Sequence, residues 1–256
     1  MNLKEKHVAA VVLAAGKGTR LGCTDIPKVM LEIANRPMVS YTIDTLEELG
    51  LLASSIVLVV GYQRLQVKDY FGTRVTYAEQ EQQLGTAHAA YVGMRELELD
   101  VEHVVVMGGD DSAFYTPRTL ERLVEQHLAT DCVLSLLTSR IDRPMNLGRV
   151  LRDDDGEFIG VVEKENMTEA QKQIDEISTG TFVFNRVWYE RIFPTMPKIP
   201  GLGEFGLPMA IEMVRQEGCN MQAIELENSN EWFGINTLEE LSEANRRKEG
   251  KKERRK

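Results

Sequence analysis

The sequence contains few cysteines and no long apolar stretch. Only three cysteines occur among 256 residues, at Cys23, Cys132 and Cys219, and they lie far apart. This spacing excludes a disulfide scaffold and a cysteine-based metal site, and it favours reduced thiols inside a cell. No apolar run reaches the roughly 18 residues that a membrane-spanning helix requires. We therefore expect a cytoplasmic protein without a membrane span.

An excess of positive charge is also lacking. The formal net charge is -10, which argues against a general nucleic-acid binder because such proteins need basic surface. The exception is the segment 246–256, which holds eight Lys or Arg and two Glu. We expect a domain at residues 1–245 and a flexible basic tail at 246–256. The tail is either a solvated, frayed helix end or a contact for an anionic partner.

Strand and helix patterns alternate through the first half of the chain. Apolar runs predict strands at 7–15, 55–61, 74–80, 103–110 and 131–139. Helical spacing between them predicts helices at 38–49, 86–97 and 117–127. This alternation is typical of an α/β domain with a parallel sheet and helices on both faces. Ligands bind such sheets beyond the carboxyl ends of the strands.

The second half of the chain shows a different pattern of expected strands and helices. A hairpin is expected at 148–164 around Asp155-Gly156, followed by a strand at 178–185 and a helix at 207–216. A strand at 221–227 and a helix at 237–245 complete the pattern. No internal repeat or linker is visible. We expect one domain, in which the second half closes over a site built by the first.

A glycine-rich segment, LAAGKGTRLG (13–22), directly follows the first predicted strand. Glycines allow close approach of the backbone to a ligand, and exposed N–H groups cradle phosphate. A dinucleotide fingerprint would need its third glycine one position before Gly22, and a Walker A loop is absent. Because Lys17 and Arg20 add two cations, the loop favours a triphosphate. Lys28, fixed by Pro27, is a candidate third cation for the same site.

Further motifs follow in order along the chain. They are PKVMLEIANRPM (27–38), EQQLGTAHAA (81–90), VVVMGGD (104–110), NLGRV (146–150), VVEK (161–164), DEISTG (175–180) and FGINTLEELSEAN (233–245). Together with the glycine-rich segment, this set resembles the sugar-1-phosphate nucleotidylyltransferase family, and GTAHA is especially similar to uridylyltransferases acting on N-acetylglucosamine 1-phosphate. The resemblance covers residues 7–245. It implies a Rossmann-like (GT-A-like) fold with a mixed, mostly parallel sheet.

The resemblance also implies a reaction. A nucleotidyl group would pass from an NTP, with UTP preferred, to a sugar 1-phosphate, giving an NDP-sugar and pyrophosphate with Mg²⁺ as cofactor. The attacking phosphate oxygen is already ionised near neutral pH, so positioning and charge neutralisation carry the catalysis. This agrees with a sequence that offers no convincing Ser/His/Asp, Cys/His or zinc constellation.

Roles for individual residues follow from the same resemblance. Arg20 and Lys28 are the expected catalytic cations. Asp110 and Asn236 are the expected Mg²⁺ ligands, a set of hard oxygen donors that phosphates and water would complete. Sugar binding is expected at Gly148, Glu163, Ser178 and Thr179. Nucleotide binding is expected at Leu13, Ala14, Ala15, Gly16, Lys17, Gly18, Gln83, Gly85 and Thr86, where Gln83 suits a pyrimidine base.

Several features depart from the family pattern and leave the substrate open. Ser178 stands where the uridylyltransferases usually have an Asn that contacts the amino sugar, and Gly108 stands where an aromatic often borders the sugar. Asp111 is expected at the surface or behind the site, and His88 is expected to pack within a helix. Two alternatives remain: a nucleotidylyltransferase with a non-sugar acceptor, and a non-catalytic nucleotide- or sugar-binding regulatory subunit. Homo-oligomerisation is also left open.

Overall fold

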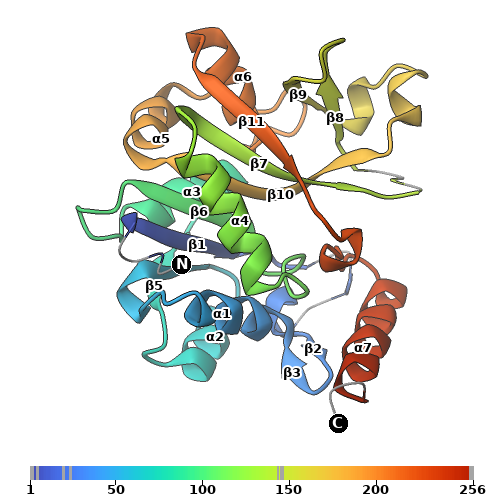
Figure 1. Cartoon of the computed structure of the whole chain (residues 1–256). Helices are drawn as coiled ribbons and strands as arrows, with labels where there is room; N and C mark the ends of the chain where they lie inside the picture. Colours follow the sequence, from blue (N-terminus) through green and yellow to red (C-terminus); the bar gives the residue numbers. More distant parts are fainter. Residues whose placement is uncertain are drawn as a thin grey trace.

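A nine-stranded sheet forms the centre of the computed structural model, which describes residues 3, 6–18, 21, 22, 25–142, 144 and 147–253. Its main strands follow the order β11-β7-β10-β6-β1-β4-β5 (Figure 1). Their bounds are β1 (Val8–Ala14), β4 (Ile56–Val60), β5 (Thr76–Glu79), β6 (His103–Gly108), β7 (Cys132–Arg140), β10 (Glu176–Asn185) and β11 (Asn220–Glu225).

Most of these strands are parallel. β1 pairs in parallel with β4 and β6, β4 with β5, and β11 with β7, whereas β10 runs antiparallel to both β6 and β7. Two short strands, β8 (Arg149–Arg152) and β9 (Phe158–Val162), form the expected hairpin, and β8 also pairs with β10. The predicted mixed, mostly parallel sheet is therefore confirmed. The insertion of β10 brings its irregular segment from Ser178 to Phe182 next to the end of β6.

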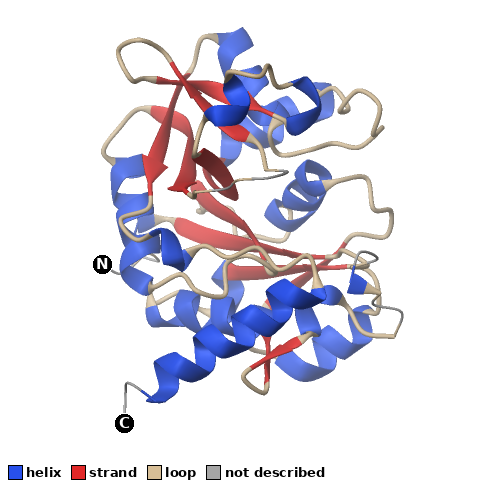
Figure 2. Ribbon diagram, turned by 90° about the vertical axis from the view of Figure 1, so that its right-hand side faces the viewer, coloured by secondary structure: helices blue, strands red, loops and turns tan. Residues whose placement is uncertain are grey.

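Helices cover both faces of the sheet (Figure 2). One face packs against α1 (Met38–Glu48), α2 (Arg64–Phe71) and α4 (Pro117–Leu128), and the other against α3 (Thr86–Met94), α5 (Arg186–Ile192) and α6 (Met209–Glu217). Within β1, Ala9 and Val11 enter one core while Ala10 and Val12 enter the other. Burial on both faces explains why this strand reads as one continuous apolar run.

Sequence periodicity missed two of the helices. Helix α2 follows β4 after residues 61–63 and buries only Val67 and Phe71, so its apolar spacing is barely visible. Helix α5 begins immediately after β10, where the Trp188 backbone N–H donates to Asn185 Oδ1 at 2.9 Å. A side-chain cap at the last residue of a strand joins the two elements without a loop, so no break in the sequence marks the boundary.

Helix α7 (Leu238–Glu253) continues beyond the boundary that the sequence suggested at residue 245. It packs near the small hairpin of β2 (Glu32–Ile33) and β3 (Arg36–Pro37) in a third apolar cluster that includes Phe114 and Ala244. The Arg247 guanidinium lies 4.2 Å from the centre of the Phe233 ring, and Lys248 Nζ lies 3.9 Å from that of Tyr41. The first part of the basic segment is thus helical and packed. Within the described residues, no helix combines the length and apolarity needed to span a membrane.

Candidate functional site

A cavity of about 410 Å³ opens where β1 and β6 end, and we call it the small cavity. This is the sheet edge at which the strand pattern predicts ligand binding. Residues predicted from widely separated motifs line it: Leu13, Ala15, Gly16, Lys28, Gln83, Gly85, Thr86, Asp110 and Ser178. The fold therefore brings the glycine-rich turn, the GTAHA segment and the end of β6 together at one place.

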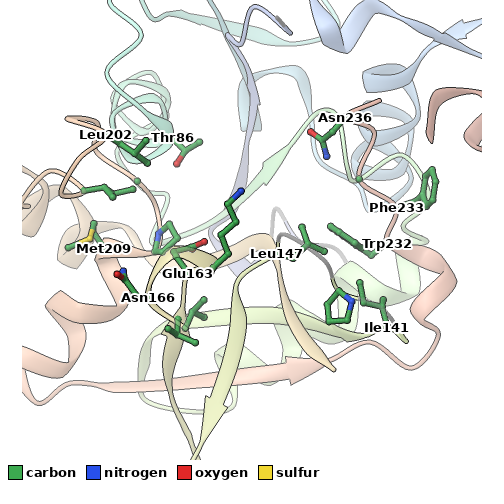
Figure 3. A pocket seen from close by; sticks show the side chains of 18 of the residues that line it. Thr86, Ile141, Leu147, Glu163, Asn166, Leu202, Met209, Trp232, Phe233 and Asn236 are labelled. Carbon is green, nitrogen blue, oxygen red and sulfur yellow. The ribbon is translucent and has the colours of Figure 1, made fainter. Parts of the chain in front are cut away.

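A second cavity of about 1680 Å³, the large cavity, adjoins the first. The β8–β9 hairpin, the segment 199–209 and the segment 229–240 supply most of its lining. Glu163 and Trp232 lie on opposite sides of this space, and Asn236 also borders it (Figure 3). Thr86, Glu204 and Pro208 line both cavities, so the two spaces share a boundary.

Lys28 joins the two cavities. Its ammonium group pairs with Asp110 Oδ2 in the small cavity and donates to Asn236 Oδ1 in the large cavity at 2.9 Å. The Lys28 side chain is 12% exposed and the Asp110 side chain 32%, so the contact is partly shielded from water. Pro27, with extended backbone, precedes the short helix η3 (Lys28–Met30) and directs the lysine to this point.

The same geometry tests whether a divalent cation suits the predicted ligands. The two oxygens Asp110 Oδ2 and Asn236 Oδ1 converge on one positively charged nitrogen. Such convergent hard oxygen donors fit Mg²⁺, which commonly takes one or two protein ligands and completes its shell with phosphates and water. The described residues contain no cluster of three or more His, Cys, Asp or Glu side chains that would form a closed metal cage.

The loop between β5 and α3 is held against the glycine-rich turn. The Gln83 side-chain amide donates to the Ala15 carbonyl oxygen at 2.5 Å. Behind it, the Gln80 amide donates to the Gly85 carbonyl at 3.0 Å and contacts His88 Nδ1 at 2.9 Å. Gln80 is 4% exposed and was not predicted, because the run EQEQQ does not reveal which glutamine is buried.

A second segment, 199–207, docks on the same loop. The Phe205 N–H donates to the Leu84 carbonyl at 2.7 Å, and the Leu207 N–H donates to Thr86 Oγ1 at 3.0 Å. At Gly85, where φ is +111°, a Cβ atom would lie 2.4 Å from the Phe205 carbonyl oxygen. Only glycine fits there. The predicted residues Gly85 and Thr86 therefore hold the docked segment, which the sequence did not single out.

The predicted sugar-side residues separate into two groups. Glu163 borders the large cavity, and a Cβ at Gly148 would lie 3.2 Å from Glu163 Oε1, so the glycine makes room for the carboxylate. Ser178 lines the small cavity. Thr179, in contrast, is 1% exposed and its hydroxyl donates to the Leu137 carbonyl at 2.7 Å. The Thr179 side chain thus faces the core rather than either cavity, because alternate residues of a strand point to opposite faces.

Three other predicted residues do not line these cavities, and a fourth lies outside the described residues. Ala14 is buried at the end of β1, although its neighbours reach the small cavity. Lys17 and Gly18 belong to the described turn but border neither cavity. Arg20 lies outside the described residues. Within the described chain, the cation brought to the cavity boundary by direct contacts with Asp110 and Asn236 is Lys28.

Asp111 lies deeper than a surface position. Its Oδ1 atom is buried and has no hydrogen-bond partner in the described part of the chain, while its side chain lines the small cavity beside Asp110. Burial raises the pKa of Asp111 well above its usual range, and the negative charge of Asp110 raises it further. A sequence pattern shows two adjacent acids, but it does not reveal that one of them turns inward.

Comparisons with known proteins place the chain among nucleotide-handling transferases. A family model for the MobA-like NTP transferase domain matches residues 10–174. The bifunctional protein GlmU of Symbiobacterium thermophilum is 39% identical over 243 residues, covering 94% of this chain and 50% of that protein. The GlmU protein of Heliobacterium modesticaldum is 37% identical over 235 residues, covering 92% and 50%. The chain thus spans about half the length of the curated relatives it matches.

A solved structure gives an independent view of the fold. A Bacillus anthracis protein named as a candidate glucose-1-phosphate thymidylyltransferase superposes with a TM-score of 0.75, covering 93% of this chain and 94% of that one. The two sequences are 19% identical. At that level the likeness concerns the fold, and it agrees with the strand arrangement described above.

Proposed function

We propose that this chain, which belongs to the family of MobA-like NTP transferases, transfers a uridylyl group from UTP to a sugar 1-phosphate. The observation that carries the proposal is the contact of Lys28 with both Asp110 and Asn236 at the boundary of two adjoining cavities. A reaction between two phosphate-bearing substrates needs two binding spaces that meet at positive charge.

The small cavity suits the nucleotide, and Ser178 on its wall is the predicted point at which the sugar of the acceptor approaches it. Ala15 and Gly16 of the glycine-rich turn line it and would bring backbone N–H groups to a phosphate, and Gln83 offers an amide that can pair with a pyrimidine edge. In the structure that amide donates to Ala15, so the base-binding loop and the turn already lie in contact. The similarity to GlmU proteins and the GTAHA segment favour UTP among the nucleotides.

The large cavity suits the acceptor. Its volume of about 1680 Å³ accommodates a sugar phosphate, and the Glu163 carboxylate on its wall can accept hydrogen bonds from sugar hydroxyls. Trp232 presents an aromatic surface on the opposite side. A carboxylate and an aromatic side chain together are suited to binding a sugar. The acceptor phosphate would then lie toward Asn236 and Lys28.

The chemistry requires no proton transfer from the protein. One oxygen of the sugar phosphate attacks the α-phosphorus of UTP, a new P–O bond forms, and the bond from the α-phosphorus to the bridging oxygen of pyrophosphate breaks. The electron pair leaves with pyrophosphate. Lys28, together with Arg20 from the glycine-rich loop, would neutralise the charge that develops on the phosphates.

Asp110 and Asn236 would hold Mg²⁺. When bound, the ion would supply further positive charge to the phosphate oxygens. The role of the chain is then to keep these two oxygen ligands within reach of the lysine ammonium, which the contacts of Lys28 support.

A substrate matrix tests the proposal. Pyrophosphate release is measured with UTP, dTTP, CTP, GTP and ATP, each combined with several sugar 1-phosphates and one polyol phosphate. Release with UTP and a sugar 1-phosphate is expected to exceed every other combination. Release only with the polyol phosphate supports a non-sugar acceptor. Nucleotide binding by folded protein without turnover of any pair contradicts the proposed reaction and supports a regulatory subunit.

A further inference from the structure

Asp111 has an acceptor that no described group satisfies. Its Oδ1 atom is buried and has no hydrogen-bond partner among the described residues. Buried acceptors in native structures nearly always have a donor, so an orphaned carboxylate oxygen calls for a ligand or a special role. Asp110, the preceding residue, already pairs with Lys28. The two adjacent acids therefore differ: Asp110 has a charged partner, and Asp111 Oδ1 has no described hydrogen-bond donor.

Gly108 makes room for the Asp111 carboxylate, and Gly180 lies in contact distance of it. At Gly108, a Cβ atom would lie 2.8 Å from Oδ1 of Asp111 and 2.8 Å from Oδ1 of Asp110. Any side chain at this position would push the carboxylates away. At Gly180, where φ is +77°, a Cβ would lie 3.6 Å from Asp111 Oδ2. The carboxylate thus sits between the end of β6 and the irregular segment of β10.

Asp111 lines the small cavity on its β10 side, beside Ser178, a residue that the family resemblance predicts to bind the sugar. Ser178, Gly180 and Gly108 line this cavity together with Asp111. The Ser178 hydroxyl accepts from the Gly180 N–H at 3.3 Å, which keeps its oxygen on the β10 segment rather than on the carboxylate. Asp111 therefore borders the small cavity beside Gly108 and Gly180, neither of which has a side chain to cover it.

We propose that Asp111 is a specificity-determining residue that accepts a hydrogen bond from a hydroxyl or amino group on the sugar ring of the acceptor. This inference rests on the proposed sugar-1-phosphate transfer. A site built around an acceptor rejects ligands that lack the matching donor, because the acceptor is then left buried and unpaired. Asp111 would thereby select among sugars beside Gly108, which has no side chain to contact the sugar.

Binding and turnover of a sugar series test this role. The variants are Asp111→Asn, which keeps the shape, and Asp111→Ala, with Asp155→Asn in the exposed β8–β9 turn as a matched control. Calorimetry measures the affinity for UDP-sugars that differ by one ring hydroxyl or amine, and kcat/KM is measured for the matching sugar 1-phosphates. Asp111→Ala is expected to lose about 10- to 100-fold for the preferred sugar and little for the analogue lacking the donor.

Other measurements separate this role from its alternatives. Affinity for UTP and affinity for Mn²⁺, followed by electron paramagnetic resonance, are expected to stay within about twofold of the wild type. A tenfold loss of Mn²⁺ affinity in Asp111→Asn would overturn the proposal and assign Asp111 to the metal. An equal loss for every sugar would overturn it as well. Wild-type protein that releases no pyrophosphate contradicts the proposed function, but its UDP-sugar affinities still test Asp111.

Discussion

The small and large cavities adjoin, yet they are built in different ways. The small cavity lies at the ends of β1 and β6, whose neighbouring strands are buried on both faces. The large cavity is enclosed by a hairpin, the segment 199–209 and the segment leading into α7, and it includes exposed side chains such as Leu202, which is 69% exposed. Under the proposed function, the first of these, which we call the rigid half because it is built on buried strands, suits the nucleotide, and the second, the loop-built half, suits the acceptor.

The largest effect is expected where the two halves meet. Asp110→Asn and Lys28→Ala each remove one side of the contact that joins the cavities. Either change is expected to lower kcat/KM, and the loss corresponds to roughly 2 to 4 kcal/mol of transition-state stabilisation. Steady-state pyrophosphate release measures it.

The control is Lys172→Ala, which removes a lysine from an exposed pair with Glu169. Its activity is expected to match the wild type. Rates near the wild type in Asp110→Asn or in Lys28→Ala would remove that residue from the mechanism.

A smaller effect is expected where the loop-built half docks on the rigid half. Gly85→Ala would bring a Cβ against the Phe205 carbonyl, whereas Gly156→Ala has a similar positive φ with no atom within 4 Å. Because Gly85 also has a backbone conformation almost restricted to glycine (φ +111°, ψ 175°), Gly85→Ala is expected to lose about 1–3 kcal/mol more than Gly156→Ala. Urea denaturation compares the free energies of unfolding. Equal losses would mean that the docked segment does not depend on Gly85.

The sequence predicts the rigid half better than the loop-built half. The strand before Gly16 and the strand before Asp110 stand out because both faces are buried, and the motifs at their ends correctly predict an NTP transferase family. The docking of Phe205 and the inward turn of Thr179 depend on contacts between distant segments. Local patterns carry no signal for such contacts, since propensity and periodicity report only on neighbours along the chain.

The smallest effect is expected at the basic end of α7. Removal of residues 246–256 would eliminate the contacts of Arg247 with Phe233 and of Lys248 with Tyr41. A loss of about 1–2 kcal/mol in unfolding free energy is expected. Removal of residues 254–256 alone serves as the control and is expected to change nothing. Unchanged stability after the longer deletion would make the basic segment a solvated end without a structural role.

The division into two halves is tested most directly by two variants measured against both substrates. Gln83→Ala changes the small cavity and Glu163→Gln the large one. The KM for UTP is expected to rise about tenfold in Gln83→Ala with the KM for the sugar 1-phosphate unchanged, and the reverse is expected in Glu163→Gln. If either variant raised both KM values alike, the assignment of the nucleotide to Gln83 and of the sugar to Glu163 would be contradicted.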